Sequence, residues 1–186
     1  MTAEDGALGN DADAPERPES ALAYWGPAIA VSLAMFIAVI DSTLMNVAVP
    51  AIVSDLDTTV PVVQGAIAIY SLVMAALMLP GSKLPSIYGV RRLMQVTLVV
   101  YAAGTLLAAV SWSPAVLYVG WSVIEGAASA VLMPLTFTVL VVTYEGTDRA
   151  KALGLLAGVN ATGAAVGPIL GGALTTFASW RWGFAL

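Results

Sequence analysis

Residues 154–172 read GLLAGVNATGAAVGPILGG, an apolar stretch in which glycine recurs at helical spacing. Gly163, Gly167 and Gly171 are four residues apart, so they share one face of a helix. Glycines at this density weaken a helix in water by about 1 kcal/mol each relative to alanine. In a bilayer the backbone keeps its hydrogen bonds, and small residues let a neighbouring helix approach closely. The stretch therefore predicts a tightly packed membrane-spanning helix, with a bend at Pro168.

Composition places the rest of the chain in a membrane as well. Its 186 residues are 59% hydrophobic and 10% charged, and the mean hydropathy is +0.89. Soluble domains carry about 25% charged residues, so there is too little polar surface here for a water-soluble globule. The sequence has no cysteine and no histidine, which argues against a disulfide framework, a metal site and the usual near-neutral proton switch. A proton carrier must therefore be a carboxylate, and no metal or cofactor is expected.

Five segments have the roughly 20 mostly apolar residues that a bilayer span needs. They cover residues 24–53, 60–80, 93–112, 114–144 and 149–177, and a sixth begins at Trp182. The first twenty residues hold six acidic side chains against Arg17 alone and contain no apolar run. This composition predicts a disordered acidic tail over residues 1–22 and a transmembrane helical bundle over residues 23–186.

The basic residues predict the orientation. If the N-terminus is cytoplasmic, the cytoplasmic segments hold six of the seven basic residues and the outer segments hold only Arg181. This is the positive-inside pattern of a multi-pass protein of the cell membrane. The six are Arg17, Lys83, Arg91, Arg92, Arg149 and Lys151.

The glycine-rich stretch also carries a family resemblance. It is similar to the antiporter signature on the fifth span of the major facilitator superfamily, a G-x(8)-G-P-x-x-G-G segment. The matching residues are Gly158, Gly167, Pro168, Gly171 and Gly172. The resemblance implies drug–proton antiport.

Asp41 is the first candidate for a functional residue. An ionised carboxylate inside a bilayer span costs at least about 2.5 kcal/mol, so it normally faces a cavity or a partner. Its context, DSTLMNVAVP at residues 41–50, resembles the first-span signature of fourteen-span drug exporters. The matches are Asp41, Thr43, Asn46, Val47, Ala48 and Pro50. The residue is expected to bind a proton or contact a cationic substrate; the alternative is a hydrogen bond that only packs helices together.

Glu125 is the second candidate. Ser122, Glu125 and Ser129 fall on one helical face at i, i+3 and i+7, and this polar stripe is expected to line a cavity. The segment resembles the fourth-span pattern R-x-x-Q-G-x-G-A-A-x-x-x-P, matching at Gly126, Ala130 and Pro134. Glu125 replaces the glutamine, and Ser122 replaces an arginine that the family links to proton coupling. Glu125 is expected to supply the missing proton site; the alternative is a permanently protonated group that bonds another helix.

The two carboxylates stand in matching positions. Asp41 precedes Pro50 by nine residues, and Glu125 precedes Pro134 by the same interval. Inverted three-span repeats are typical of transporters, and such a repeat predicts both residues around one central cavity.

The loop GSKLPSIYGVRRL, residues 81–93, resembles the superfamily's cytoplasmic loop signature, G-x-L-x-D-R-x-G-R-R. Lys83, Gly89, Arg91 and Arg92 fit, while Ser86 holds the position of the aspartate. The resemblance implies control of the inward gate, with a weakened lock because the aspartate is missing. The alternative is an ordinary short loop with a glycine turn and flanking cations.

These observations predict an all-α integral membrane protein, the N-terminal six-helix half of a major facilitator fold with five full spans and the start of a sixth. The resemblance implies proton-coupled export of small amphipathic or cationic compounds. The expected partners are a small-molecule substrate, protons, the lipid bilayer and a second transporter half, and no nucleic acid. No enzyme motif is present. Without a second half, this chain is not expected to transport alone.

The alternative is a non-transporting membrane protein that binds another helical protein through the glycine faces of the fifth span. Ser86 and Ser122 favour this reading, because both depart from the family pattern. The complete signatures of the first and fifth spans favour transport.

Overall fold

The computed structural model describes residues 20–184, and over that range the regular structure is helical. The long helices are α1 (Ala21–Asp55), α2 (Val60–Gly81), α4 (Val90–Ala109) and α7 (Gly146–Phe177). A fifth long segment runs through α5 (Pro114–Leu117), the π-helix η2 (Tyr118–Glu125) and α6 (Gly126–Thr143). Short helices α3 (Leu84–Tyr88) and α8 (Arg181–Phe184) follow α2 and α7.

Within the described residues, five helical segments are long and apolar enough to cross a bilayer, which confirms the five predicted spans. The third begins at Val90 and ends at Ala109, three residues earlier than expected at both ends. Gly89 sets its start, because a backbone φ of +79° there separates it from α3. The α1 helix begins at Ala21, two residues before the predicted start of the bundle, and most of the predicted acidic tail (residues 1–19) lies outside the described residues.

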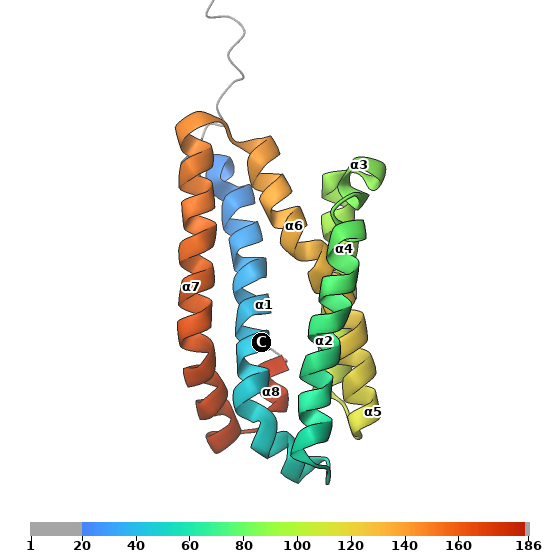
Figure 1. The fold of residues 1–186 in the computed structure, drawn as a ribbon. Coiled ribbons are helices and arrows are strands. Elements are labelled where there is room, and N and C mark those ends of the chain that lie inside the picture. The colour runs from blue at the N-terminus through green and yellow to red at the C-terminus, as the bar shows by residue number, and fades with distance from the viewer. Residues whose placement is uncertain (1–19, 185–186) are drawn as a thin grey trace, which may run out of the picture.

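The glycine stripe of α7 packs against α1, and the two helices run side by side (Figure 1). A Cβ atom added at Gly163 would lie 3.1 Å from the Phe36 ring, and one at Gly171 would lie 3.3 Å from the backbone of Leu44. The predicted close packing of this stripe is therefore confirmed. Gly158 and Gly172, which belong to the same signature, face open space, with nothing within 4 Å of an added Cβ.

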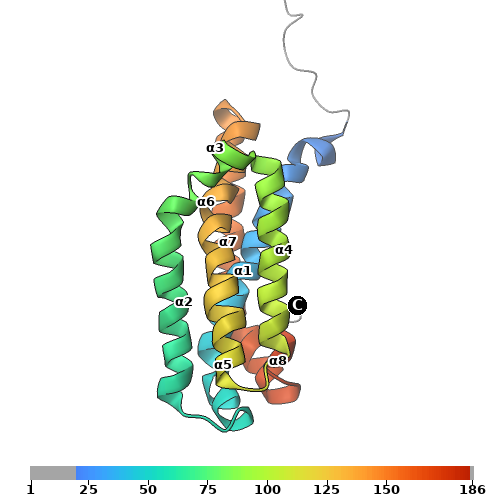
Figure 2. The ribbon, with the colours of Figure 1, turned by 90° about the vertical axis from the view of Figure 1, so that its right-hand side faces the viewer.

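A second close approach joins α4 to η2, which lie next to each other in Figure 2. A Cβ atom at Gly104 would come within 2.8 Å of the Glu125 backbone nitrogen, and one at Gly120 would come within 2.9 Å of the Ala108 nitrogen. The backbones touch because both positions lack side chains. This contact lies in the π-helical segment, a rare winding that often marks functional sites.

The connections separate into two ends of the bundle. The turn that carries α3 and the turn between α6 and α7 lie at one end, and the α1–α2 and α7–α8 connections lie at the other (Figure 1). At the second end Arg181 pairs with the carboxylate of Asp55 and donates to the Ser111 carbonyl at 2.6 Å, so α8 is tied to the ends of α1 and α4. The basic residues Lys83, Arg91, Arg92, Arg149 and Lys151 belong to the first end.

An aromatic contact joins the first turns of α1 to the end of α6. The Tyr144 hydroxyl donates to the Tyr24 carbonyl at 2.8 Å and accepts from the Ala28 amide at 3.3 Å. The hydroxyl therefore bridges an amide and a carbonyl that are four residues apart in α1. Pro27, which lies between them, has no amide hydrogen. Trp25 stacks on the Tyr144 ring with centroids 5.2 Å apart.

Candidate functional site

The site is a pair of buried carboxyl groups in the middle of the bundle. Asp41, halfway along α1, is 3% exposed, and its Oδ2 accepts from the indole nitrogen of Trp121 at 2.8 Å. Glu125, the last residue of η2, is fully buried. The two carboxyl groups lie within hydrogen-bonding reach of each other. The structure therefore brings together the two ionisable residues that stand in matching sequence positions.

Two oxygen atoms of this pair have no hydrogen-bond donor, although the buried Tyr101 hydroxyl, which also has no partner in the described structure, lies near Glu125. Asp41 Oδ1 and Glu125 Oε1 are buried, and neither accepts a hydrogen bond from a donor in the described structure. The Thr105 hydroxyl lies 2.9 Å from Glu125 Oε2 and 2.9 Å from the Tyr101 carbonyl, but it has one proton for these two acceptors. A proton on one carboxyl group of the pair removes one of these shortages, because a protonated carboxyl is itself a donor.

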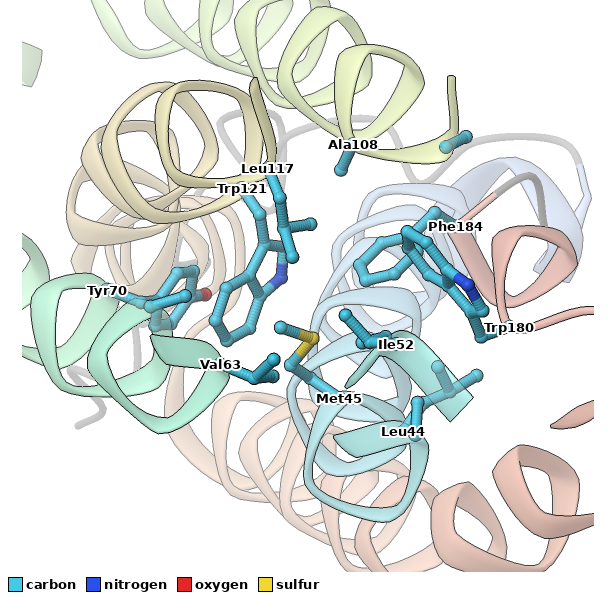
Figure 3. Close-up of a cluster of buried hydrophobic side chains, with 13 residues drawn as sticks. Leu44, Met45, Ile52, Val63, Tyr70, Ala108, Leu117, Trp121, Trp180 and Phe184 are labelled. Carbon is cyan, nitrogen blue, oxygen red and sulfur yellow. The ribbon is translucent and has the colours of Figure 1, made fainter. Parts of the chain in front are cut away.

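An aromatic pair closes one side of the site. The ring of Tyr70, on α2, stacks on Trp121 with centroids 4.5 Å apart and ring planes 14° from parallel. Figure 3 shows these two side chains face to face between their helices. The Tyr70 hydroxyl donates to Ser129 on α6 at 2.9 Å, so the aromatic pair is fixed from both ends.

The three residues of the polar stripe predicted on the fourth span have different partners. Ser122 is fully buried and donates to the Ala66 carbonyl of α2 at 2.8 Å, whereas Ser129 accepts from Tyr70 and Glu125 meets Asp41 and Thr105. The reason is local: η2 forms i→i+5 hydrogen bonds, so the i, i+3, i+7 rule for a regular helix does not apply across it.

Other sequence-predicted residues lie apart from the pair. Asn46 is exposed and donates to the Ser42 carbonyl of its own helix at 2.8 Å. In the loop after α2, the expected turn at Gly89 is present, with its positive φ. Ser86, at the position of the signature aspartate, donates to the Lys83 carbonyl at 2.7 Å and so closes the turn locally.

Sequence reasoning missed two partners of the pair, Trp121 and Thr105, and the Tyr70 ring that stacks on Trp121. Trp121 had a usable signal. Other tryptophans of the chain lie near span ends, where interfacial anchors belong, but Trp121 lies well inside the fourth span. A buried indole N–H normally needs an acceptor, so its position pointed to a polar group in the core.

Two cavities flank α1 at this level. One, of about 250 Å³, is lined by Phe36 and Asp41 of α1 together with residues of α4, α7 and α8, among them Tyr101 and Phe184. The other, of about 210 Å³, lies between α1, α2 and α6. Its lining residues are Met35, Ala38, Val39, Ser42, Thr43, Tyr70, Met74, Ser129, Leu132 and Met133.

Five apolar spans, a glycine-packed helix pair and a buried carboxyl pair define a polytopic membrane protein with ionisable groups at mid-bundle. Residues 31–186 match the family model of the Major Facilitator Superfamily. The chain belongs to this family, which confirms the family assignment made from the sequence motifs.

Similar proteins are export and efflux transporters. The chain is 36% identical over 149 residues to the cephamycin export protein of Amycolatopsis lactamdurans, covering 80% of this chain and 30% of that protein. It is 30% identical over 160 residues to a puromycin resistance protein of Streptomyces alboniger, with 86% and 31% covered. An efflux pump of Dothistroma septosporum is 34% identical over 156 residues, with 84% and 27% covered. The chain thus spans about a third of the length of the curated relatives it matches.

Proposed function

We propose that this chain forms the N-terminal half of a secondary transporter that exports small amphipathic or cationic compounds from the cell in exchange for protons. The Asp41–Glu125 pair is the proton site. The chain lies in the cell membrane, and its N-terminus is in the cytoplasm. The observation that carries the proposal is the pair itself: two facing carboxyl groups, fully or almost fully buried, each with one oxygen that accepts no hydrogen bond.

The proton completes the hydrogen bonding of the pair. A buried carboxylate without a partner is costly, and a proton shared by two facing carboxyl groups supplies a donor to an oxygen that otherwise accepts no hydrogen bond. Binding and release of this proton change the charge of the bundle core. They therefore change the free-energy difference between conformations that bury the pair and conformations that expose it to water. Coupling between proton binding and alternating access follows from that difference.

Relatives and sequence motifs support the rest of the proposal. The printed names of the similar proteins include export, resistance and efflux, and those proteins are about three times as long as the matched part of this chain. The first-span and fifth-span signatures support membership of the fourteen-span drug:proton antiporter branch. They also support a second half as the partner of this one. The Gly89 turn with Arg91 and Arg92 is the proposed inward gating loop, because a rigid turn with two cations can engage a facing helix end.

A second role for Asp41, contact with a cationic substrate, is favoured by one observation. Asp41 lines the 250 Å³ cavity together with Phe36, Tyr101 and Phe184, and aromatic faces with a carboxylate can hold a cation. The non-transporting alternative is favoured by the second glycine face of α7, because Gly154 and Gly158 have nothing within 4 Å of an added Cβ.

Infrared spectroscopy of the purified protein in lipid tests the proton site. We expect a carbonyl band of a protonated carboxylic acid at neutral pH, shifted in heavy water, and we expect Glu125→Gln to remove it or change its pH profile. Glu145→Gln, an exposed carboxylate outside the core, is the matched control and should leave the band unchanged. A wild-type spectrum without any such band at neutral pH would show that both core carboxyl groups are ionised, and the proposal would fail.

Export measurements test the coupling. In vesicles that carry this chain together with a C-terminal half, Glu125→Gln should abolish or shift the pH dependence of export while expression is unchanged. Asp41→Asn should do the same, or should lose cationic compounds selectively. Unchanged pH dependence in both variants and in the double variant would make the pair structural.

A further inference from the structure

The cavity between α1, α2 and α6 differs chemically from the carboxyl pair beside it. Its ten lining residues are apolar or carry hydroxyl groups, and none of them is charged. Three of them are methionines, Met35, Met74 and Met133, whose flexible and polarisable side chains adapt to irregular apolar ligands. Ser129 and Tyr70 contribute the hydroxyl groups that can fix one polar atom of a ligand.

The Tyr70–Trp121 stack separates this cavity from the pair. Tyr70 lines the cavity, Trp121 lies behind its ring, and Asp41 lies behind the Trp121 indole. Trp121 is 1% exposed and Tyr70 is 6% exposed, so the stack is a packed wall (Figure 3). A ligand in the cavity therefore contacts the Tyr70 ring and does not contact the Asp41 carboxylate.

We propose that this cavity binds an uncharged, apolar molecule or the apolar part of one, and that the Tyr70–Trp121 wall keeps that ligand out of contact with Asp41 and Glu125. The inference rests on the proposed function and narrows it. A ligand in this cavity is held by methionine and aromatic surface, and it carries no charge that balances the charge of the proton site. Tyr70 and Trp121 are then positioning residues: they hold the Asp41 carboxyl group on one side and shape the ligand site on the other.

The charge of the preferred ligand distinguishes this proposal from a model in which the ligand contacts the carboxylates directly. A cation that enters the cavity loses water and finds no opposite charge in the lining, which is costly. A neutral molecule of the same shape loses little, because the lining is apolar and the hydroxyl groups accept or donate a single hydrogen bond. Two probes of one shape and different charge therefore give a direct test.

The test uses cysteine protection, since the chain has no cysteine of its own. Met133→Cys places a thiol in the cavity, and Val99→Cys places one on an exposed face of α4 as the control for partitioning into lipid. The purified full chain in lipid nanodiscs is alkylated with N-ethylmaleimide in the presence of 4-methylbiphenyl or of its cationic isostere N-methyl-4-phenylpyridinium. We expect 4-methylbiphenyl to slow alkylation at position 133 severalfold more than at position 99, and the cation to protect position 133 at least tenfold more weakly.

Two results would overturn the proposal. One is equal or stronger protection of position 133 by the cation that disappears in Asp41→Asn, which would place the carboxyl pair in contact with the ligand. The other is no selective protection of position 133 by 4-methylbiphenyl. Neither result bears on the infrared band of the proton site, so failure of this inference and failure of the proposed function are distinguishable.

The wall itself is tested by Trp121→Leu and Trp121→Phe in the same assay. Trp121→Phe keeps an aromatic ring, so the cation should remain a weak protector. Trp121→Leu removes the ring that stacks on Tyr70 and opens a path to Asp41, so the cation should gain protection that Asp41→Asn abolishes. The contrary result is that the cation protects position 133 in Trp121→Leu no better than in the wild type, while 4-methylbiphenyl still protects it. In that case the aromatic pair does not separate the cavity from Asp41, and that part of the proposal is wrong.

Discussion

Gly167→Ala is the sharpest test of the contact between α1 and α7. An added Cβ at this position would overlap the Thr43 hydroxyl oxygen and would lie 3.0 Å from the Thr43 Cβ. The Ile40 backbone is 3.5 Å away, an ordinary contact, so Thr43 is the group that must move. Its hydroxyl donates within α1 to the Val39 and Ile40 carbonyls, both at 2.9 Å, and a rotation would disturb that bond.

Two opposing effects set the magnitude. Replacing glycine by alanine in a helix gains about 1 kcal/mol of helix propensity. Overpacking a close contact costs about 1–3 kcal/mol. We therefore expect Gly167→Ala to lower the free energy of unfolding by about 0–2 kcal/mol. Gly158→Ala is the matched control on the same helix, because its added Cβ meets nothing within 4 Å, and it should gain up to about 1 kcal/mol.

Reversible unfolding in mixed detergent micelles, followed by circular dichroism, measures both variants. A double-mutant cycle with Thr43→Ala isolates the cause, because removing the hydroxyl should recover part of the loss in Gly167→Ala. Gly167→Leu, whose side chain forces the two backbones apart, should lose more than Gly167→Ala. If Gly167→Ala is as stable as Gly158→Ala, or if Thr43→Ala recovers nothing, the helices are not packed as closely as the structure indicates.

The remaining structural contacts give further expectations. Tyr144→Phe removes the hydroxyl that joins a rung of α1, so it should cost about 1–3 kcal/mol of unfolding free energy, whereas Tyr88→Phe, at an exposed position, should cost nothing measurable. Arg181→Gln breaks a partly exposed ion pair and should cost about 1 kcal/mol, less in high salt; a loss that does not depend on salt would contradict the ionic contribution. Ile87→Cys should be protected from an impermeant thiol reagent added to intact cells and Thr59→Cys should react with it, and the opposite pattern would reverse the proposed topology.

Much of the fold could be predicted because the bilayer makes local sequence decisive. Backbone groups must be satisfied within each span, so runs of apolar residues give the helices directly. The glycine spacing around Gly163 and Gly167 also gave the packing face of α7, since small residues at one spacing permit only one close approach. The span ends were less certain: the shift of the third span came from the backbone turn at Gly89, which hydropathy does not register.

The site was harder to predict, for two physical reasons. The π-helical winding of η2 changes which side chains share a face, so a regular-helix rule does not give the contact of Ser122 with α2. The hydrogen-bond partners of Asp41 and Glu125 come from α4 and η2, and contacts between spans are not encoded in any single span. Only Trp121, a tryptophan seven residues inside the fourth span, indicated such a contact in the sequence.

The departures from the family pattern at positions 122 and 125 form one coherent change. The fourth-span pattern that this chain resembles has an arginine and a glutamine where Ser122 and Glu125 stand. Relative to that pattern, the core around Asp41 has lost one positive charge and gained a carboxyl group. An unbalanced buried charge is strongly destabilising. In the proposed function, a proton on the buried Asp41–Glu125 pair restores that balance.

This argument gives a last prediction about the stability of the pair. Glu125→Gln keeps the shape and supplies an amide donor to Asp41, so it should change the free energy of unfolding little. Glu125→Leu has a similar size but no donor, and it leaves Asp41 Oδ1 buried without the partner that the proton provided, which should cost about 1–3 kcal/mol more than the glutamine variant. In an Asp41→Leu background the need for a donor is gone, so the difference between the two variants should shrink. If glutamine and leucine at position 125 are equally stable in the wild-type background, no hydrogen bond joins the two groups, and the shared proton that explains this core does not exist.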